Sequence, residues 1–295
     1  MAHFGIISPN ASGHLNPMTA LAVAIRNRGH RVTFFLVGNP PLSVSNAGFE
    51  IVQMGGAIFP PNEHRAGVQR LGTLTGREAL KYTTNLIARA VRAILELGPE
   101  IVGESGVTAL IVDQSSFAGG TVADRLGLPF ATVCNALLLN KEPDIPPFFG
   151  PWQPQNSWWS RIRNRIGWAV LDRLYSPSLK QIQEHRRQHG LVVPGLIADT
   201  WSSRLQISQQ PEAFEFTRHK LPEQFKFVGP LRLPEAEPDI PFSWSRLDDR
   251  SLIYASLGTL QNRAAKAFRM IAEACAGLDV QLVMSTGRGL EPEAL

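Results

Sequence analysis

The sequence predicts an α/β fold in which a doubly wound parallel sheet is followed by the beginning of a second, smaller sheet of the same kind. Two observations support this prediction. Short, continuous apolar runs alternate with helical stretches over residues 4–134, and the same alternation starts again at Ser251. Strands of a parallel sheet are apolar throughout because helices cover both faces. The 295 residues are enough for two domains of ordinary size.

The first strand and helix place a loop at the edge of this sheet. Residues 4–8 form the first apolar run and residues 9–14 form the loop. Asn16 is a suitable N-cap for the following helix, and Pro17 suits its first position. Open α/β folds bind their ligands at this carboxyl edge. The loop has neither a Gly-x-Gly-x-x-Gly pattern nor a P-loop, so a dehydrogenase is only a remote alternative.

His14 stands at the tip of this loop, one residue before the expected helix. The positive end of a helix dipole opposes protonation, and a neutral histidine in a cleft can act as a base near pH 7. The alternative is that His14 only fills the loop or binds backbone groups.

Asp113 follows the apolar run at 108–112 and should open onto the same sheet edge as the loop of His14. An aspartate that accepts a hydrogen bond from one imidazole nitrogen fixes the tautomer and makes the other nitrogen a better base. The alternative is that Asp113 is the N-cap of the next helix, since Ser115 and Ser116 follow it.

The remaining pattern completes the first domain. Further strands are expected at 51–54, 129–134, 205–208 and 225–228, a second strand at 32–37, and helices at 77–97, 118–126 and 172–189. Gly98-Pro99 is a suitable end for the first of these helices.

Residues 141–168 differ from the rest in composition. Four of the six tryptophans lie between 152 and 168, interleaved with arginines. Such aromatics can line an apolar acceptor pocket or lie at a membrane surface, or they can simply pack a helical hairpin against the domain. The candidate acceptor contacts are Phe117, Phe148, Phe149 and Trp152.

A stretch rich in Pro, Glu and Asp divides the chain, which predicts domains at 1–230 and 251–295 with a linker at 231–250. Ser256, Gly258 and Thr259 follow the first strand of the second domain, where backbone N–H groups and hydroxyls could hold phosphate. The second domain is shorter than a self-sufficient one, so we expect it to be incomplete.

Composition excludes several other classes. The net charge of +4 is small and its arginines and lysines are mostly scattered, so we expect no nucleic acid partner. Cys134 and Cys275 lie far apart in apolar runs, and no cysteine or histidine cluster has metal-ligand spacing. The chain has no signal peptide pattern and no apolar run of transmembrane length, which favours a cytoplasmic protein.

Four segments together resemble the UDP-glycosyltransferases of the GT-B fold, and most of all the bacterial zeaxanthin and macrolide glycosyltransferases. These segments are residues 12–17 (SGHLNP), 110–113 (LIVD), 227–231 (FVGPL) and 252–259 (LIYASLGT). The resemblance implies that His14 is the general base and that Asp113 pairs with it. It also implies a nucleotide-sugar co-substrate without a metal or cofactor, with donor contacts at Gly13, Ser256, Gly258 and Thr259.

The resemblance implies transfer of a hexose, from UDP-glucose, to a hydroxyl of an apolar acceptor such as a carotenoid, a macrolide or a lipid-like alcohol, with inversion. The aromatic segment at 148–168 adds a peripheral membrane contact to the expectations. The family's donor-binding motif with a His-Gly-Gly-like turn is absent from residues 251–295. The alternative function is therefore an acceptor-binding module that needs a missing donor domain or a partner chain.

Overall fold

The computed structural model describes residues 1–38, 42–60, 63, 66–67, 70–233, 242–258 and 264–287. The chain divides into two compact units. The first comprises Met1–His64 and Thr84–Leu233, and the second comprises Arg65–Thr83 and Pro234–Leu295. The domain limits expected from the sequence, 1–230 and 251–295, stay a prediction.

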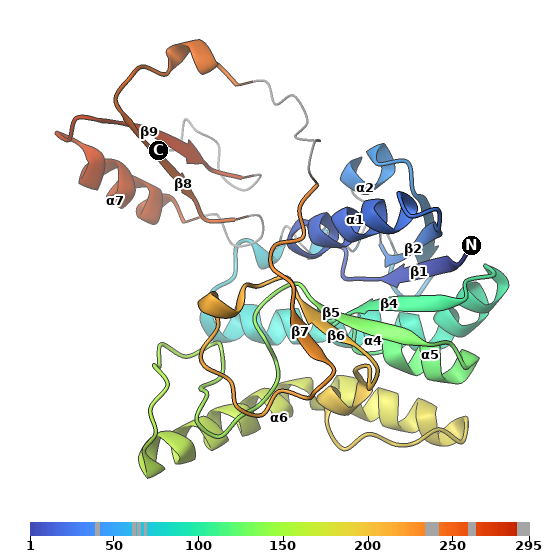
Figure 1. Cartoon of the computed structure of the whole chain (residues 1–295). Coiled ribbons are helices and arrows are strands. Elements are labelled where there is room, and N and C mark those ends of the chain that lie inside the picture. The colour runs from blue at the N-terminus through green and yellow to red at the C-terminus, as the bar shows by residue number, and fades with distance from the viewer. Residues whose placement is uncertain are drawn as a thin grey trace. The chain divides into compact units, whose positions relative to one another are not determined.

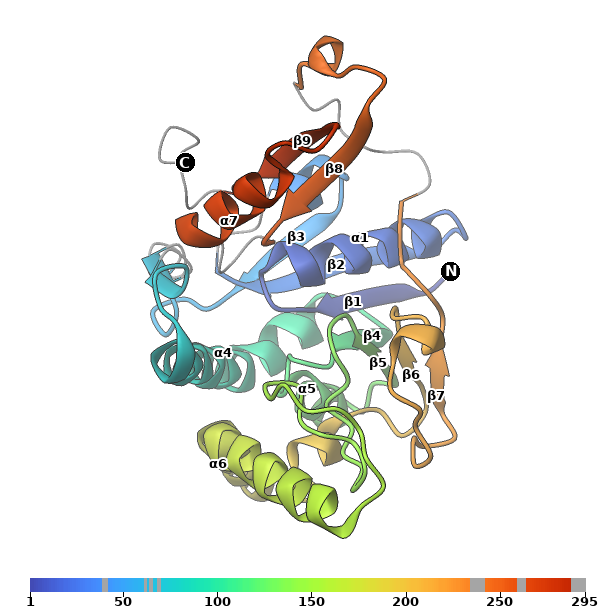
Figure 2. The same ribbon diagram turned by 90° about the vertical axis from the view of Figure 1, so that its left-hand side faces the viewer.

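The first unit is built on a seven-stranded sheet in the order β3-β2-β1-β4-β5-β6-β7, and every neighbouring pair is parallel (Figures 1 and 2). Its strands are β1 (His3–Ile7), β2 (Arg31–Val37), β3 (Glu50–Met54), β4 (Ala109–Asp113), β5 (Phe130–Cys134), β6 (Gln206–Ser208) and β7 (Phe225–Phe227). The strand order reverses between β1 and β4, and such a switch point opens a crevice at the carboxyl ends of the two strands. The predicted doubly wound sheet is confirmed.

Helices cover both faces of this sheet. They are α1 (Ser12–Arg26), α2 (Leu42–Asn46), α4 (Gly76–Glu104), α5 (Gly119–Leu126) and α6 (Trp158–Gln188), with short 3-10 turns η1 (Ile197–Thr200) and η2 (Glu212–Phe214). One core cluster includes Ile7 and Phe35 with residues of α4 and α5. The other includes Ile6 and Phe34 with residues of α1. Successive strand residues thus enter opposite cores, which explains the continuous apolar runs.

Helix α1 begins at Ser12, four residues before the expected N-cap Asn16. The Ala11 carbonyl accepts hydrogen bonds from the backbone N–H groups of His14 and Leu15, both at 2.9 Å. Pro17 therefore lies inside the helix and cannot donate the usual backbone hydrogen bond. The first turn forms because it buries Leu15 completely in the core, and this burial offsets the missing bond.

Helix α4 continues through Gly98 and Pro99 to Glu104, beyond its expected end. A Cβ atom at Gly98 would lie only 3.0 Å from Cγ2 of Val122 in α5. The glycine therefore permits close packing between the two helices instead of ending α4. Val102, in the added turn, is buried in the core and stabilises the extension.

Helix α6 begins at Trp158, fourteen residues before the expected start at Asp172. Ser157 caps it: the Ser160 backbone N–H donates to Ser157 Oγ at 3.2 Å, and the Ser157 backbone N–H donates to Ser160 Oγ at 3.1 Å. The segment rich in tryptophan and arginine is thus the first half of one long helix. Within the described residues, no helix combines the length and apolarity needed to cross a bilayer.

The second unit contains two parallel strands, β8 (Ser251–Ser256) and β9 (Val280–Ser285), joined through α7 (Ala265–Cys275). Phe268 of α7 is fully buried. The short turn η3 (Trp244–Arg246) precedes β8. This is the βαβ arrangement that the sequence predicts for the beginning of a second sheet.

Candidate active site

His14 and Asp113 meet at the switch point of the sheet. His14 occupies the third position of α1, directly after β1, and Asp113 is the last residue of β4. His14 Nδ1 donates a hydrogen bond to Asp113 Oδ2 at 2.8 Å, because an ionised carboxylate can only accept. Nε2 has no hydrogen-bond partner among the described residues, and the His14 side chain is 21% exposed. The exposed nitrogen therefore carries the lone pair that a general base needs.

Asp113 is held in place by two further hydrogen bonds. Its side chain is 1% exposed. Asn135 Nδ2 donates to Asp113 Oδ2 at 2.7 Å, and the Ser115 backbone N–H donates to Oδ1 at 2.8 Å. With both oxygens bonded, the carboxylate cannot turn away from the imidazole. The N-cap alternative does not apply, because α5 begins at Gly119 with Ala118 as its N-cap.

The pKa of His14 lies above its ordinary value. Burial alone would lower it, but the hydrogen bond and the negative charge of Asp113 together outweigh burial. This differs from the expectation that the start of the helix keeps the imidazole neutral. The helix terminus carries roughly half a charge, whereas Asp113 carries a full charge at 2.8 Å.

The candidate donor contacts lie in both units. Gly13 is exposed in the first turn of α1, and a Cβ atom there would meet nothing within 4 Å, so packing does not require a glycine. Ser256 ends β8, and the Gly258 backbone N–H donates to Ser256 Oγ at 3.2 Å. Gly258 has φ +76°, a conformation that favours glycine. Thr259 lies outside the described residues.

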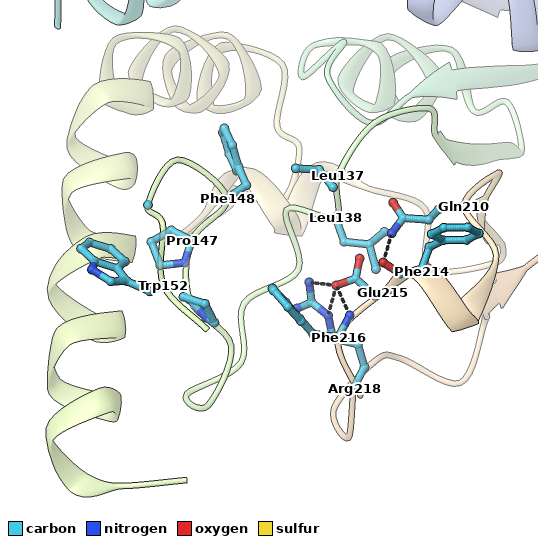
Figure 3. Close-up of a pocket in the computed structure, with 12 residues that line it drawn as sticks. Leu137, Leu138, Pro147, Phe148, Trp152, Gln210, Phe214, Glu215, Phe216 and Arg218 are labelled. Atoms are coloured by element: carbon cyan, nitrogen blue, oxygen red, sulfur yellow. Dashed lines mark hydrogen bonds and ion pairs between the residues drawn. The ribbon is translucent and has the colours of Figure 1, made fainter. Parts of the chain in front are cut away.

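A mostly apolar pocket of about 190 Å³ opens beside the segment that follows β5 (Figure 3). Phe148 and Trp152, two of the candidate acceptor contacts, line it. Phe149 contacts the rings of both in edge-to-face geometry. Other lining residues include Leu137, Leu138, Pro147, Gln210, Phe214, Glu215, Phe216 and Arg218.

Phe117 does not line this pocket, which corrects the sequence-based expectation. Its side chain is buried in the core and packs against Tyr175, with ring centroids 5.1 Å apart. It lies just before α5, where an apolar side chain gains most by entering the core between the helix and the sheet.

An ion pair that the sequence analysis missed forms one wall of the pocket (Figure 3). Arg218 Nε and Nη2 donate to Glu215 Oε1 at 3.1 and 2.9 Å, and both side chains are 5% exposed. Arg218 Nη1 also donates to the Asn140 carbonyl at 2.8 Å. Asn140 Oδ1 accepts from Gln114 Nε2 at 3.1 Å. These hydrogen bonds connect the pocket wall to Gln114, the residue that follows Asp113 at the end of β4.

Asn135, which donates a hydrogen bond to Asp113, is the second part of the site that the sequence did not predict. It directly follows β5, next to β4 in the sheet, so its place at the carboxyl edge is the only signal that could have found it. Residues 135–140 run from Asn135, bonded to Asp113, to Asn140, bonded to Gln114. Because residues 137 and 138 in this segment line the pocket, one short segment joins the dyad to the pocket.

In the described part of the chain, no group of three or more His, Cys, Asp or Glu side chains is placed to hold a metal ion. Burial raises the pKa of the Cys134 thiol to about 12, so this cysteine is not a nucleophile near neutral pH.

Comparison with known proteins identifies relatives over nearly the whole chain. No protein-family model matches it. It is 33% identical over 302 residues to a zeaxanthin glucosyltransferase of Pseudescherichia vulneris, covering 99% of this chain and 68% of that protein. It is 32% identical over 285 residues to a zeaxanthin glucosyltransferase of Pantoea ananas, covering 97% of this chain and 66% of that protein.

Solved structures agree on the fold. The calicheamicin glycosyltransferase CalG4 aligns with a TM-score of 0.62 at 22% identity, covering 100% of this chain and 66% of that one. The chain thus spans about two thirds of the length of the proteins it matches. On its identity to the two glucosyltransferases, the chain belongs to the GT-B UDP-glycosyltransferase family that includes the bacterial zeaxanthin glucosyltransferases.

Proposed function

We propose that the whole protein transfers a hexose from a nucleotide sugar to a hydroxyl group of an apolar acceptor, and that the nucleotide sugar is UDP-glucose. The observation that carries the proposal is the His14–Asp113 dyad: Nδ1 is bonded to a buried carboxylate and Nε2 has no partner among the described residues. The zeaxanthin glucosyltransferase names of the two relatives favour a glucose donor and a carotenoid-like alcohol.

In the proposed reaction His14 Nε2 removes the proton from the acceptor hydroxyl. The acceptor oxygen forms a bond to the anomeric carbon as the bond from that carbon to the diphosphate oxygen breaks. The electron pair leaves with the nucleoside diphosphate, and the configuration at the anomeric carbon inverts. Asp113 stabilises the imidazolium that forms, so that the developing charge on His14 stays paired.

The acceptor site in this proposal is the apolar pocket. Phe148 and Trp152 line it, Phe149 packs beside it, and Leu137 and Leu138 lie within five residues of the asparagine bonded to Asp113. Apolar walls with a few fixed polar groups suit a large, hydrophobic alcohol. Donor contacts at Gly13, Ser256, Gly258 and Thr259 are part of the same proposal.

The alternative is an acceptor-binding module that needs the rest of a donor domain, supplied by the same protein or by a separate chain. The observation that favours it is that the chain spans about two thirds of its relatives' length. A cytoplasmic location and a peripheral membrane contact through residues 148–168 complete the proposal.

The test combines donor binding with product analysis. The 295-residue chain is titrated with UDP and UDP-glucose by calorimetry, and is then incubated with UDP-glucose and zeaxanthin. With the whole protein we expect a β-linked product, identified by its anomeric proton coupling, and a loss of about 10²- to 10⁴-fold in the His14→Ala variant. A His14→Ala variant that kept its turnover would exclude His14 as the base. Acceptor binding without donor binding, in a folded chain, would favour the module.

A further inference from the structure

The solvent-facing side of the first half of α6 carries an apolar stripe. A surface helix normally presents polar residues to solvent, and α6 already buries its opposite side in the first unit. The stripe residues are between 43% and 65% exposed, and the rings of the two tryptophans stack at 3.8 Å. We call this set the outer stripe: Trp158, Trp159, Ile162, Ile166 and Val170.

Only positive charge borders the outer stripe on its own helix. No aspartate or glutamate occurs over residues 157–171, which contain three arginines. Arg161 pairs with Asp144 at 2.5 Å. Arg163 binds a neighbouring asparagine side chain and a backbone carbonyl, and Arg165 forms no ion pair with any described residue. The rim of the stripe therefore carries uncompensated positive charge.

We propose that the outer stripe binds the surface of an anionic phospholipid bilayer, with α6 lying in the plane of the interface. Tryptophan side chains partition to the headgroup level of a bilayer, and arginines beside them can reach the lipid phosphates. The stripe lies along the exposed side of one helix, as in helices that bind in the plane of a bilayer, and its positive charge complements an anionic surface. A protein partner of the usual mixed charge would not explain why residues 157–171 contain arginines but no aspartate or glutamate.

The inward side of the same helix packs against two residues that line the apolar pocket. A Cβ atom at Gly167 would lie 2.7 Å from Cγ of Pro147 and 3.4 Å from Cζ3 of Trp152, two residues that line the pocket. Trp168 Nε1 donates to the Ile145 carbonyl at 2.9 Å. Binding of α6 to a bilayer would thus bring the pocket close to alcohols dissolved in the lipid. This consequence rests on the proposed function, the transfer of a hexose to an apolar alcohol, whereas the binding of α6 to lipid does not depend on that reaction.

The first test is co-sedimentation of the 295-residue chain with vesicles of phosphatidylcholine, alone or mixed with phosphatidylglycerol. We expect binding to the mixed vesicles that weakens with added salt, and much weaker binding to phosphatidylcholine alone. Brominated acyl chains should quench the fluorescence of the bound chain. A Trp158→Ser, Ile166→Ser double variant should bind at least about tenfold more weakly, because it removes two apolar contacts.

Charge and self-association are tested separately. An Arg165→Gln variant should bind anionic vesicles roughly fivefold more weakly. A Trp244→Ser variant is the matched control, since Trp244 is 66% exposed but belongs to the second unit, and its binding should be unchanged. The proposal would be overturned if the chain bound neutral and anionic vesicles equally well. It would also be overturned if substitutions in the outer stripe changed only the oligomeric state of the protein and not its binding to vesicles. Transfer to a water-soluble alcohol, measured in parallel, shows whether any loss belongs to the membrane contact or to the chemistry.

Discussion

Replacement of Asp113 by asparagine tests whether this carboxylate sets the protonation of His14. In the native chain, burial lowers the pKa of His14, and the hydrogen bond and charge of Asp113 raise it by more. Asparagine at position 113 carries no charge. The burial of His14 then still lowers its pKa, and only a weaker hydrogen bond to a neutral side chain raises it. We therefore expect the pKa of His14 to fall from above its ordinary value of 6.5 to below it in the Asp113→Asn variant.

The structure also gives the cost of this variant in stability. Asp113 accepts three hydrogen bonds, from His14, Asn135 and the backbone N–H of Ser115. An asparagine oxygen placed at Oδ2 keeps the first two, while its NH₂ group faces the Ser115 N–H and leaves that donor unpaired. One unsatisfied buried donor should lower the free energy of unfolding by about 1–3 kcal/mol.

The pH dependence of this loss has a definite sign. Because the folded pKa of His14 is raised, its stabilising contribution is fully present below pH 6.5 and is lost as the pH rises through the folded pKa. The difference in unfolding free energy between the native chain and Asp113→Asn should therefore be largest on the acidic side and shrink toward alkaline pH.

The assay is an NMR titration of the histidine side chains, with the His14 signals assigned by their loss in a His14→Gln variant. Urea unfolding between about pH 5.5 and about pH 9 gives the stability differences. The reasoning would be refuted by a His14 pKa that stays above 6.5 in Asp113→Asn. A stability difference that grew with rising pH would refute the assigned sign.

Two further predictions concern the hydrogen bond of Asn135 and the close packing of Gly120 in α5. In an Asn135→Ala variant, Asp113 Oδ2 loses its 2.7 Å donor, so the carboxylate should act more strongly on the imidazole and raise the histidine pKa further; a lower pKa in the same NMR titration would contradict this. In Gly120→Ala, the new Cβ would lie 2.1 Å from the Thr200 carbonyl oxygen, so we expect a loss of about 1–3 kcal/mol in urea unfolding. Gly103→Ala is the control: its Cβ would lie at an ordinary 3.4 Å from the nearest side chain, and alanine should stabilise this helix by about 0.5–1 kcal/mol. Equal effects of the two substitutions would show that the close contact is not the cause.

The sheet could be predicted because its central strands β1, β2 and β4 are buried on both faces, which leaves short continuous apolar runs in the sequence. The limits of the helices were harder to predict from the sequence. Asn16 and Pro17 are a good local start signal, yet the core contact of Leu15 moves the start of α1 to Ser12. The start of α6 was missed because apolar residues lie on its exposed side as well as on its buried side. The sequence therefore lacks the alternation of apolar and polar residues by which a buried helix face is recognised.

The dyad could be predicted because strand ends of a parallel sheet share one edge. Its supporting groups could not, since an asparagine after a strand has no signal that separates it from an ordinary turn residue. Phe117 shows the converse error. An aromatic residue close to a catalytic candidate in the sequence suggests a ligand contact, but the side chain enters the core.

The switch point explains why the pKa of His14 lies above its ordinary value, although the start of α1 alone would lower it. β1 and β4 are neighbours in the sheet although a hundred residues separate them, so the start of α1 and the end of β4 face the same crevice. The helix terminus supplies a partial positive charge that opposes protonation, and Asp113 supplies a full negative charge that favours it. Asn135 and Ser115 hold that charge at 2.8 Å from Nδ1. Because this contact holds the proton on Nδ1, Nε2, which has no partner among the described residues, is the nitrogen available for the proposed proton transfer.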